Sequence, residues 1–345
     1  MSPETDIIVA GAGIVGLSAA MLAILRWPQC RIIVLERSRI GSGASRFGGA
    51  SDVPFTPDER HRELVWRSTR VRRDYPQLPE VSRRVPTIWI SKASPERLSE
   101  RLGGAKVTPF DHTEGALPIR LHPGERAWRA GEGRFGCPNL ACQTLARRLR
   151  ASGRVRIFEA TRVEAIERCD VGLRIFTARA AISATGAWAV SQSWAGPHKG
   201  VRLKRIVAVH LETKALHRLQ IQYDHEDLYF LPDPRQPGRS ILCLSSPERA
   251  QGTNPDTFSL TRDDRALALA ALAKHAPELV NNLAGGRVFC DAYNEECAPE
   301  ITVSAELPGL FLAGVCSGSG FRHAPAIADH ALDLVARYLL HAHAA

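Results

Sequence analysis

Three glycines with a fixed spacing near the start of the chain are the clearest candidates for chemistry. Gly11, Gly13 and Gly16 form a G-x-G-x-x-G pattern directly after the apolar run 6–10, which contains Ile and Val and is typical of a buried strand. A helical apolar pattern follows, and Glu36 stands 20 residues after Gly16, at the end of a second apolar run. This order of strand, glycines, helix, strand and acid predicts a dinucleotide site.

Each part of the pattern has a physical role in holding two linked phosphates. Gly11 permits a tight turn, Gly13 lets the backbone approach a pyrophosphate, and Gly16 lets helix and strand pack closely. The helix that begins near Ile14 directs free N–H groups and a partial positive charge at the phosphates. Glu36 is expected to accept hydrogen bonds from a ribose hydroxyl pair, and its charge argues against a ribose 2′-phosphate.

Four later segments follow in an order that resembles a known family. They are a Gly/Ser-rich stretch at 41–50, a helix and strand pattern at 138–163, an Ala-Thr-Gly-Ala-Trp signature at 184–188, and an apolar strand at 310–314 that leads into Gly-Ser-Gly-Phe-Arg-His-Ala-Pro at 318–325. Together with the glycine pattern, they resemble the FAD-dependent superfamily of D-amino-acid oxidase and sarcosine oxidase. The resemblance extends over nearly the whole chain, from residue 7 to residue 340.

The resemblance implies FAD as the cofactor and a set of residues that contact it. In this superfamily the Gly/Ser-rich loop wraps the flavin, and the N-terminus of the last helix favours the anionic reduced flavin. The residues expected to bind FAD are Gly11, Gly13, Ile14, Gly16, Glu36, Arg37, Ala44, Ser45, Val163, Thr185, Gly186, Gly314, Gly318, Gly320 and Phe321. An NAD-only dehydrogenase is the less favoured alternative.

The resemblance also implies two interleaved domains. We expect an α/β protein in which a Rossmann-like FAD-binding domain of the glutathione-reductase type is interleaved with a substrate domain built on an antiparallel sheet. The FAD-binding domain is expected at 1–50, 132–197 and 303–345, and the substrate domain at 51–131 and 198–302. Consecutive strand-like runs without intervening helices favour the antiparallel sheet. These runs lie at 201–212, 219–223, 228–231 and 240–244.

The chemistry implied for such a protein is oxidation of a C–N bond in a small amine or amino acid, with hydride transfer to flavin N5. Because the cofactor carries the difficult step, the protein must supply orientation and electrostatics. Two alternatives stay open: an FAD-dependent 2-hydroxy acid dehydrogenase, and a catalytic or structural subunit of a heteromeric flavin amine dehydrogenase. The electron acceptor is open among oxygen, a quinone and a partner subunit, because the run 241–246 lacks the Lys that activates oxygen in monomeric sarcosine oxidases.

Three residues are candidates for contact with the substrate. Arg322 matches a basic residue that lies beside the substrate carboxylate in the sarcosine-oxidase-like branch, and a guanidinium can bind a carboxylate through two hydrogen bonds. Arg46 is a second candidate for this role, and Tyr229 matches a strand Tyr that often faces the substrate cavity. The alternative roles are an Arg on the surface of the last helix and a Tyr packed within a sheet.

The chain departs from the family pattern in the stretch 287–294. Glycine and D-amino-acid oxidases hold the carboxylate there with an Arg, and this chain has no Arg in register. Cys290 falls close to the Cys that bonds the flavin covalently in sarcosine-oxidase-like enzymes, but the interval to Pro299 is longer than in that pattern. We therefore predict a non-covalently bound flavin, with Cys290 as a buried free thiol.

Composition restricts the class of protein further. The 345 residues are 44% apolar and 23% charged, the balance of an ordinary globular protein. The net charge of +9 comes from dispersed Arg, and aromatic residues are only 6%, which argues against a nucleic-acid groove. Eight Cys and 12 His show no ligand spacing, so no metal site is expected. No apolar run is long enough to cross a membrane, and the acidic start leads directly into a strand, so a cytoplasmic location is expected.

Overall fold

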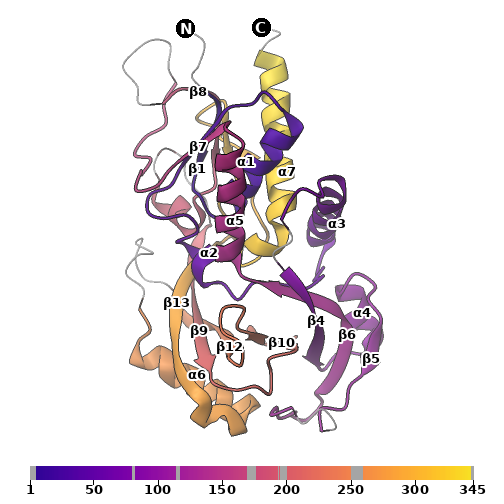
Figure 1. Ribbon diagram of the computed structural model, residues 1–345. Coiled ribbons are helices and arrows are strands. Elements are labelled where there is room, and N and C mark those ends of the chain that lie inside the picture. The colour runs from indigo at the N-terminus through magenta and orange to yellow at the C-terminus, as the bar shows by residue number, and fades with distance from the viewer. Residues whose placement is uncertain are drawn as a thin grey trace.

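The computed structural model describes residues 5–79, 82–113, 117–168, 176–192, 194, 200–249 and 259–342. Two β-sheets form its framework, and they lie one above the other in Figure 1. Within these ranges, no helix combines the length and the apolar character that crossing a membrane requires.

The first sheet has six strands in the order β14-β15-β8-β1-β2-β7. Every pairing is parallel except that between β14 and β15. Parallel strands covered on both faces are apolar throughout, as the fully buried β2 shows. The strands are β1 (Thr5–Ala10), β2 (Ile32–Leu35), β7 (Val155–Phe158), β8 (Ala178–Ser183), β14 (Thr302–Val303) and β15 (Leu310–Leu312).

Three helices share the main hydrophobic core with the first sheet. They are α1 (Ile14–Arg26), α5 (Pro138–Ala151) and α7 (Gly320–Ala342), which lie together in the upper part of Figure 1. The helix α1 ends just before Pro28, which cannot continue a helix. These elements confirm the expected Rossmann-like half of the fold.

A fourth helix, α3 (Glu59–Asp74), is held against α7 by buried charge. The carboxylate of Asp329 on α7 is only 2% exposed and accepts hydrogen bonds from Arg67 Nε at 2.6 Å and Arg70 Nη2 at 3.0 Å. Arg26 of α1 pairs with the same carboxylate. Because an unpaired buried charge is costly, these contacts fix the position of α3 beside α7.

The second sheet has nine strands in the order β13-β9-β12-β11-β10-β4-β6-β3, with β5 also paired to β6. Its strands are β3 (Ser51–Asp52), β4 (Ser82–Ser91), β5 (Val107–Pro109), β6 (Arg126–Gly136), β9 (Arg202–Leu211), β10 (Gln220–Tyr223), β11 (Leu228–Pro232), β12 (Ser240–Arg249) and β13 (Leu283–Tyr293). The remaining elements are α2 (Ala44–Phe47), α4 (Pro95–Arg101), α6 (Arg262–His275) and the 3₁₀ helices η1 (Gly186–Ser191) and η4 (Pro277–Asn282).

The second sheet is antiparallel, as expected, with one exception. β4 and β10 pair in parallel, with Trp89 opposite Gln222. Parallel neighbours need a long crossover connection. Here that connection passes through β6, α5 and the first sheet before it returns. The interleaving of the two halves of the fold therefore produces this single parallel pair.

The two faces of the second sheet have different partners. Val207, Phe230 and Leu242 point to one face and pack with Ala268 and Leu272 of α6. Ile206, Tyr229 and Phe289 point to the other face and pack with α2, next to the first sheet. That second face therefore forms the floor of the space between the sheets. The exact boundaries of the two expected domains stay a prediction.

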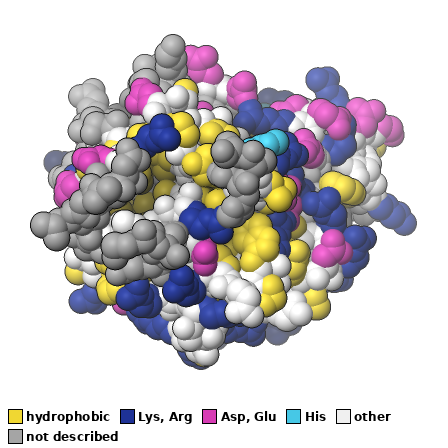
Figure 2. All heavy atoms as spheres, turned by 90° about the horizontal axis from the view of Figure 1, so that it is seen from above, with side chains coloured by type: hydrophobic (Ala, Val, Ile, Leu, Met, Phe, Trp, Pro, Cys, Tyr) yellow, Lys and Arg dark blue, Asp and Glu magenta, His cyan; other side chains and the backbone are white. Residues whose placement is uncertain are grey.

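The basic residues do not gather in one place on the face drawn in Figure 2. Lys and Arg side chains are spread around this face, with Asp and Glu side chains among them. This distribution agrees with the dispersed Arg residues of the sequence.

Candidate functional site

A cavity of about 730 Å³ lies between the two sheets. The first sheet contributes the glycine turn after β1, the segment after β8 and the loop before α7, while the second sheet contributes the face that carries Tyr229 and Phe289. Residues of the segment 43–55 form a further wall. Among the described residues, no group of three His, Cys, Asp or Glu side chains is placed to hold a metal ion.

The three glycines of the N-terminal pattern differ in what surrounds them. A Cβ on Gly11, which has a φ of +105°, would lie 2.4 Å from Ala184 O, and a Cβ on Gly16 would lie 2.1 Å from Gly11 O. A Cβ on Gly13 would meet only Ser45 Oγ, at 3.4 Å. Gly11 and Gly16 therefore serve close backbone packing, whereas Gly13 leaves free space at the cavity wall.

The N-terminus of α1 opens into this free space. Its N-cap residue, Gly13, has no side chain to accept a hydrogen bond, and Ile14 N donates to Ser45 Oγ at 3.1 Å. The first N–H groups of a helix have no acceptor within the helix, so those of the first turn other than Ile14 N are left for an anion. This cradle fits the pyrophosphate of FAD.

Glu36 lies in the cavity wall and also holds the glycine turn. Its two carboxylate oxygens accept hydrogen bonds from Ala12 N and Ser38 N, each at 2.9 Å. The side chain is 7% exposed, and this burial raises the pKa of the Glu36 carboxyl despite the two N–H donors. Each oxygen retains a second lone pair, so acceptance of a ribose hydroxyl remains compatible with this geometry.

Arg322 stands in the first turn of α7 and lines the same cavity. Its Nη1 donates to Val53 O at 3.2 Å, while Nε is buried without an acceptor among the described residues. Burial lowers the pKa of the Arg322 guanidinium, and the charge of Asp52 opposes this shift. The edge formed by Nε and Nη2, which can bind a carboxylate with two parallel hydrogen bonds, has no acceptor in the described part of the chain.

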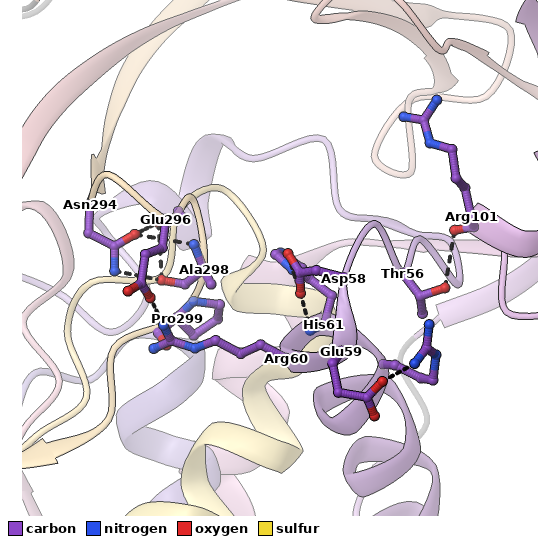
Figure 3. Close-up of polar contacts among 12 residues, drawn as sticks. Thr56, Asp58, Glu59, Arg60, His61, Arg101, Asn294, Glu296, Ala298 and Pro299 are labelled. Carbon is purple, nitrogen blue, oxygen red and sulfur yellow. Dashed lines mark hydrogen bonds and ion pairs between the residues drawn. The ribbon is translucent and has the colours of Figure 1, made fainter.

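The segment that supplies Val53 O leads into the start of α3, whose polar contacts are drawn in Figure 3. Asp58 caps α3 by accepting from His61 N at 2.9 Å, and it also contacts His61 Nδ1 at 2.8 Å. Arg60 reaches across to the loop after β13, where its Nη2 donates to Pro299 O at 2.7 Å and its Nη1 pairs with Glu296. The start of α3 is therefore tied to the loop after β13.

Tyr229 lies in a row of side chains that crosses the second sheet. Trp89 pairs with Gln222, and Gln222 pairs with Tyr229, so all three share the face toward the cavity, and all three line it. Gln222 Nε2 donates to Ser51 Oγ at 3.0 Å, and Ser51 Oγ donates to Gln220 Oε1 at 2.9 Å. Sequence reasoning missed Trp89 and Gln222. For Gln222 a signal was present, because Gln220 and Gln222 alternate with Ile221 and Tyr223 and so share one face of the strand.

The structure places the predicted site residues as follows. Every expected FAD-binding residue except Gly16 lines the cavity, and so do Arg322 and Tyr229. Arg46 does not line the cavity: its side chain is exposed, and its guanidinium carbon lies 5.3 Å from the centre of the Phe47 ring. Within the single turn of α2, Ala44 and Ser45 face the cavity, whereas Arg46 points away from it. The direct contacts to FAD and substrate stay predictions.

Cys290 is expected to form no bond with the flavin. It is 4% exposed, packs with Ala187, Leu203 and Val315, and does not line the cavity. Acid precipitation of the holoprotein should therefore release all FAD into the supernatant. Yellow colour in the pellet would contradict this, and the Cys316→Ala variant would then show whether the cavity-lining Cys316 is the attachment site.

Comparison with known proteins agrees with this geometry. A family model described as FAD dependent oxidoreductase matches residues 6–334. No curated protein sequence matches the chain.

Three solved structures share the fold at low sequence identity. Glycine oxidase from Geobacillus kaustophilus is 19% identical, with a TM-score of 0.75 over 97% of this chain and 95% of that chain. L-proline dehydrogenase from P. horikoshii is 19% identical, with a TM-score of 0.78 over 98% and 94%. Fructosyl amine: oxygen oxidoreductase (Amadoriase I) from Aspergillus fumigatus is 17% identical, with a TM-score of 0.77 over 98% and 87%. The family match extends across both sheets, and the N-terminus of α1 fits a pyrophosphate. This chain therefore belongs to the FAD-dependent oxidoreductase family.

Proposed function

We propose that the protein oxidises the C–N bond of a small amine or amino acid that bears a carboxylate. The observation that carries this proposal is the guanidinium of Arg322, which lines the cavity and whose Nε–Nη2 edge has no acceptor among the described residues. A buried donor without an acceptor costs about 1 to 3 kcal/mol, so a ligand that supplies one is favoured. The names of the three similar structures, which refer to glycine, proline and fructosyl amine, support an amine substrate.

In this proposal the chain binds, orients and shields the substrate. FAD supplies the hydride acceptor when it is bound. Arg322 holds the carboxylate, while Trp89, Tyr229 and Phe289 surround the rest of the substrate with aromatic surface and exclude water. Gln222, held by Ser51, offers a polar group between the two aromatic neighbours. An amine held in its neutral form needs no protein base for hydride loss, which agrees with the absence of an obvious acid–base pair in the sequence.

Anaerobic mixing with matched substrates tests this proposal. Each amino acid, in both chiral forms, is compared with the 2-hydroxy acid of the same carbon skeleton, such as alanine with lactate. We expect amino acids to bleach the flavin and hydroxy acids to leave it oxidised. Bleaching by hydroxy acids alone would instead establish the 2-hydroxy acid dehydrogenase alternative.

The electron acceptor and the location of the protein are proposals that rest on the sequence. The electron acceptor is one of oxygen, a quinone and a partner subunit, and size-exclusion chromatography of the protein from its native host tests for the partner subunit. The cytoplasmic location is likewise a sequence-based prediction.

A further inference from the structure

Asp291 places a carboxyl group in the wall of the cavity without a hydrogen-bond donor. It lies near the end of β13, where Phe289, Asp291 and Tyr293 alternate toward the cavity and line it. No described residue donates a hydrogen bond to the Asp291 carboxyl or forms an ion pair with it. Asp291 is half-buried and lines the cavity, so its carboxyl is available to whatever occupies the cavity.

Asp291 lies beside the loop that precedes α7. Ser317 N donates to Ala292 O at 3.0 Å, so this loop is hydrogen-bonded to the end of β13. A Cβ on Gly318 would lie 2.2 Å from the Tyr293 hydroxyl, and the charge of Asp291 acts on the thiol of Cys316. Since Gly314, Gly318 and Gly320 of this loop line the cavity and are expected to contact FAD, Asp291 stands at the cofactor part of the site.

The charged and titratable groups around Asp291 leave its carboxyl largely uncompensated. Lys204 of β9 stands opposite Asp291 in the sheet, but its ammonium pairs with Asp227 and lies 4.9 Å from the centre of the Tyr293 ring. Burial raises the pKa of the Tyr293 hydroxyl and of the Cys316 thiol, so both are neutral near pH 7. Burial likewise raises the pKa of the Asp291 carboxyl to about 6, against the opposing charge of Lys204.

The position of Asp291 points to the cofactor rather than to the substrate carboxylate. The groups that act electrostatically on the Arg322 guanidinium are Asp52, Tyr229 and Tyr293, and Asp291 is not one of them. Tyr293 stands two residues after Asp291 on β13 and lines the cavity together with Asp291 and Arg322.

We propose that Asp291 lowers the reduction potential of the bound FAD. Reduction by two electrons and one proton converts FAD to FADH⁻, which places a negative charge on the flavin ring. An ionised carboxylate in the same cavity wall repels that charge, because charges interact more strongly at a protein surface than in bulk water. The inference rests on FAD binding and on the placement of the loop before α7, and it is independent of the substrate class.

The proposal predicts a pH-dependent effect whose sign follows from the ionisation of Asp291. Well above pH 6 the carboxylate is charged in the oxidised enzyme, so it opposes reduction. Well below pH 6 it is neutral and has no effect. Reduction raises the pKa of the carboxyl further, so over an intermediate pH range reduction takes up an additional proton.

Potentiometric titration of the holoprotein without substrate tests the proposal. Wild type, Asp291→Asn and Glu164→Gln are compared at about pH 5 and about pH 8. These values lie below and above the raised pKa of the Asp291 carboxyl. Glu164 is the matched control, because it lines the same cavity but is 74% exposed beside Arg162. At the higher pH, Asp291→Asn should raise the potential by about 30 mV or more, equivalent to a tenfold change in the two-electron equilibrium. At the lower pH it should match wild type, and Glu164→Gln should match wild type at both.

Three results would overturn the proposal: an unchanged potential in Asp291→Asn at the higher pH, an equal shift at both pH values, or an equal shift in Glu164→Gln. If Asp291→Asn fails to retain FAD, the wild-type protein alone decides the question. Its potential should then fall more steeply with pH just above pH 6 than at either end of the range, and a uniform slope would refute the role of Asp291.

Discussion

Replacement of Arg322 by Met is expected to abolish reduction of the bound FAD by substrate, while the FAD content stays that of wild type. Met has a similar length but offers no hydrogen-bond donor, so a substrate carboxylate would be left without its charged partner in the cavity wall. Such a charge costs several kcal/mol. The measurement is the anaerobic rate of flavin bleaching at increasing substrate concentration. FAD retention is expected because the Arg322 side chain donates to Val53 O, on the side of the second sheet.

Arg322→Lys separates charge from geometry. Lys keeps the positive charge but loses the fork of two parallel donors, so substrate affinity should fall about tenfold, or roughly 1.4 kcal/mol. Arg46→Met is the matched control, since Arg46 is exposed and does not line the cavity. Equal reduction rates and equal apparent affinities in wild type and Arg322→Met would remove Arg322 from the site.

Replacement of Gly13 by Val should yield a folded but colourless protein. A Cβ on Gly13 meets only Ser45 Oγ, at 3.4 Å, so a side chain can begin there without a clash with the protein. The same side chain would occupy the space that the pyrophosphate needs at the N-terminus of α1. FAD affinity should fall at least about a hundredfold, or roughly 2.8 kcal/mol. Absorbance of the purified protein and FAD titration of the apoprotein measure this loss.

Gly16→Ala is the control for Gly13→Val, because it should act on the fold instead. Its Cβ would lie 2.1 Å from Gly11 O, so the start of α1 must separate from β1. The expected result is a lower thermal midpoint of the apoprotein, whereas Gly13→Val apoprotein should melt close to wild-type apoprotein. Full FAD occupancy in Gly13→Val would show that the pyrophosphate lies elsewhere.

The first sheet and its glycine turn could be predicted from the sequence, because the signals are local. The G-x-G-x-x-G pattern, the strand before it and the helix that ends before Pro28 all depend on residues within one short segment. The predicted strands at 201–212 and 228–231 correspond to β9 and β11 for the same reason. Both are runs of mostly buried apolar residues, and such runs can be recognised in the sequence itself.

Pairing between distant segments could not be predicted. The parallel contact between β4 and β10 joins residues that are more than a hundred positions apart, and no local pattern specifies it. β13 also escaped prediction, since Gly285 and Gly286 interrupt its strand-like pattern. That strand brings Asp291 and Tyr293 into the cavity and turns Cys290 away from it.

The sequence by itself therefore determined the cofactor half of the protein: the glycine turn, the acid at Glu36, the family, and Arg322 at the start of the last helix. Only the tertiary structure decided which side chains share the cavity with them. It directed Arg46 outward and brought Asp291 to the loop before α7. The physical reason is that backbone turns and helix termini depend on neighbouring residues, whereas the wall of a cavity is set by the register of strands that meet only after the whole chain has folded.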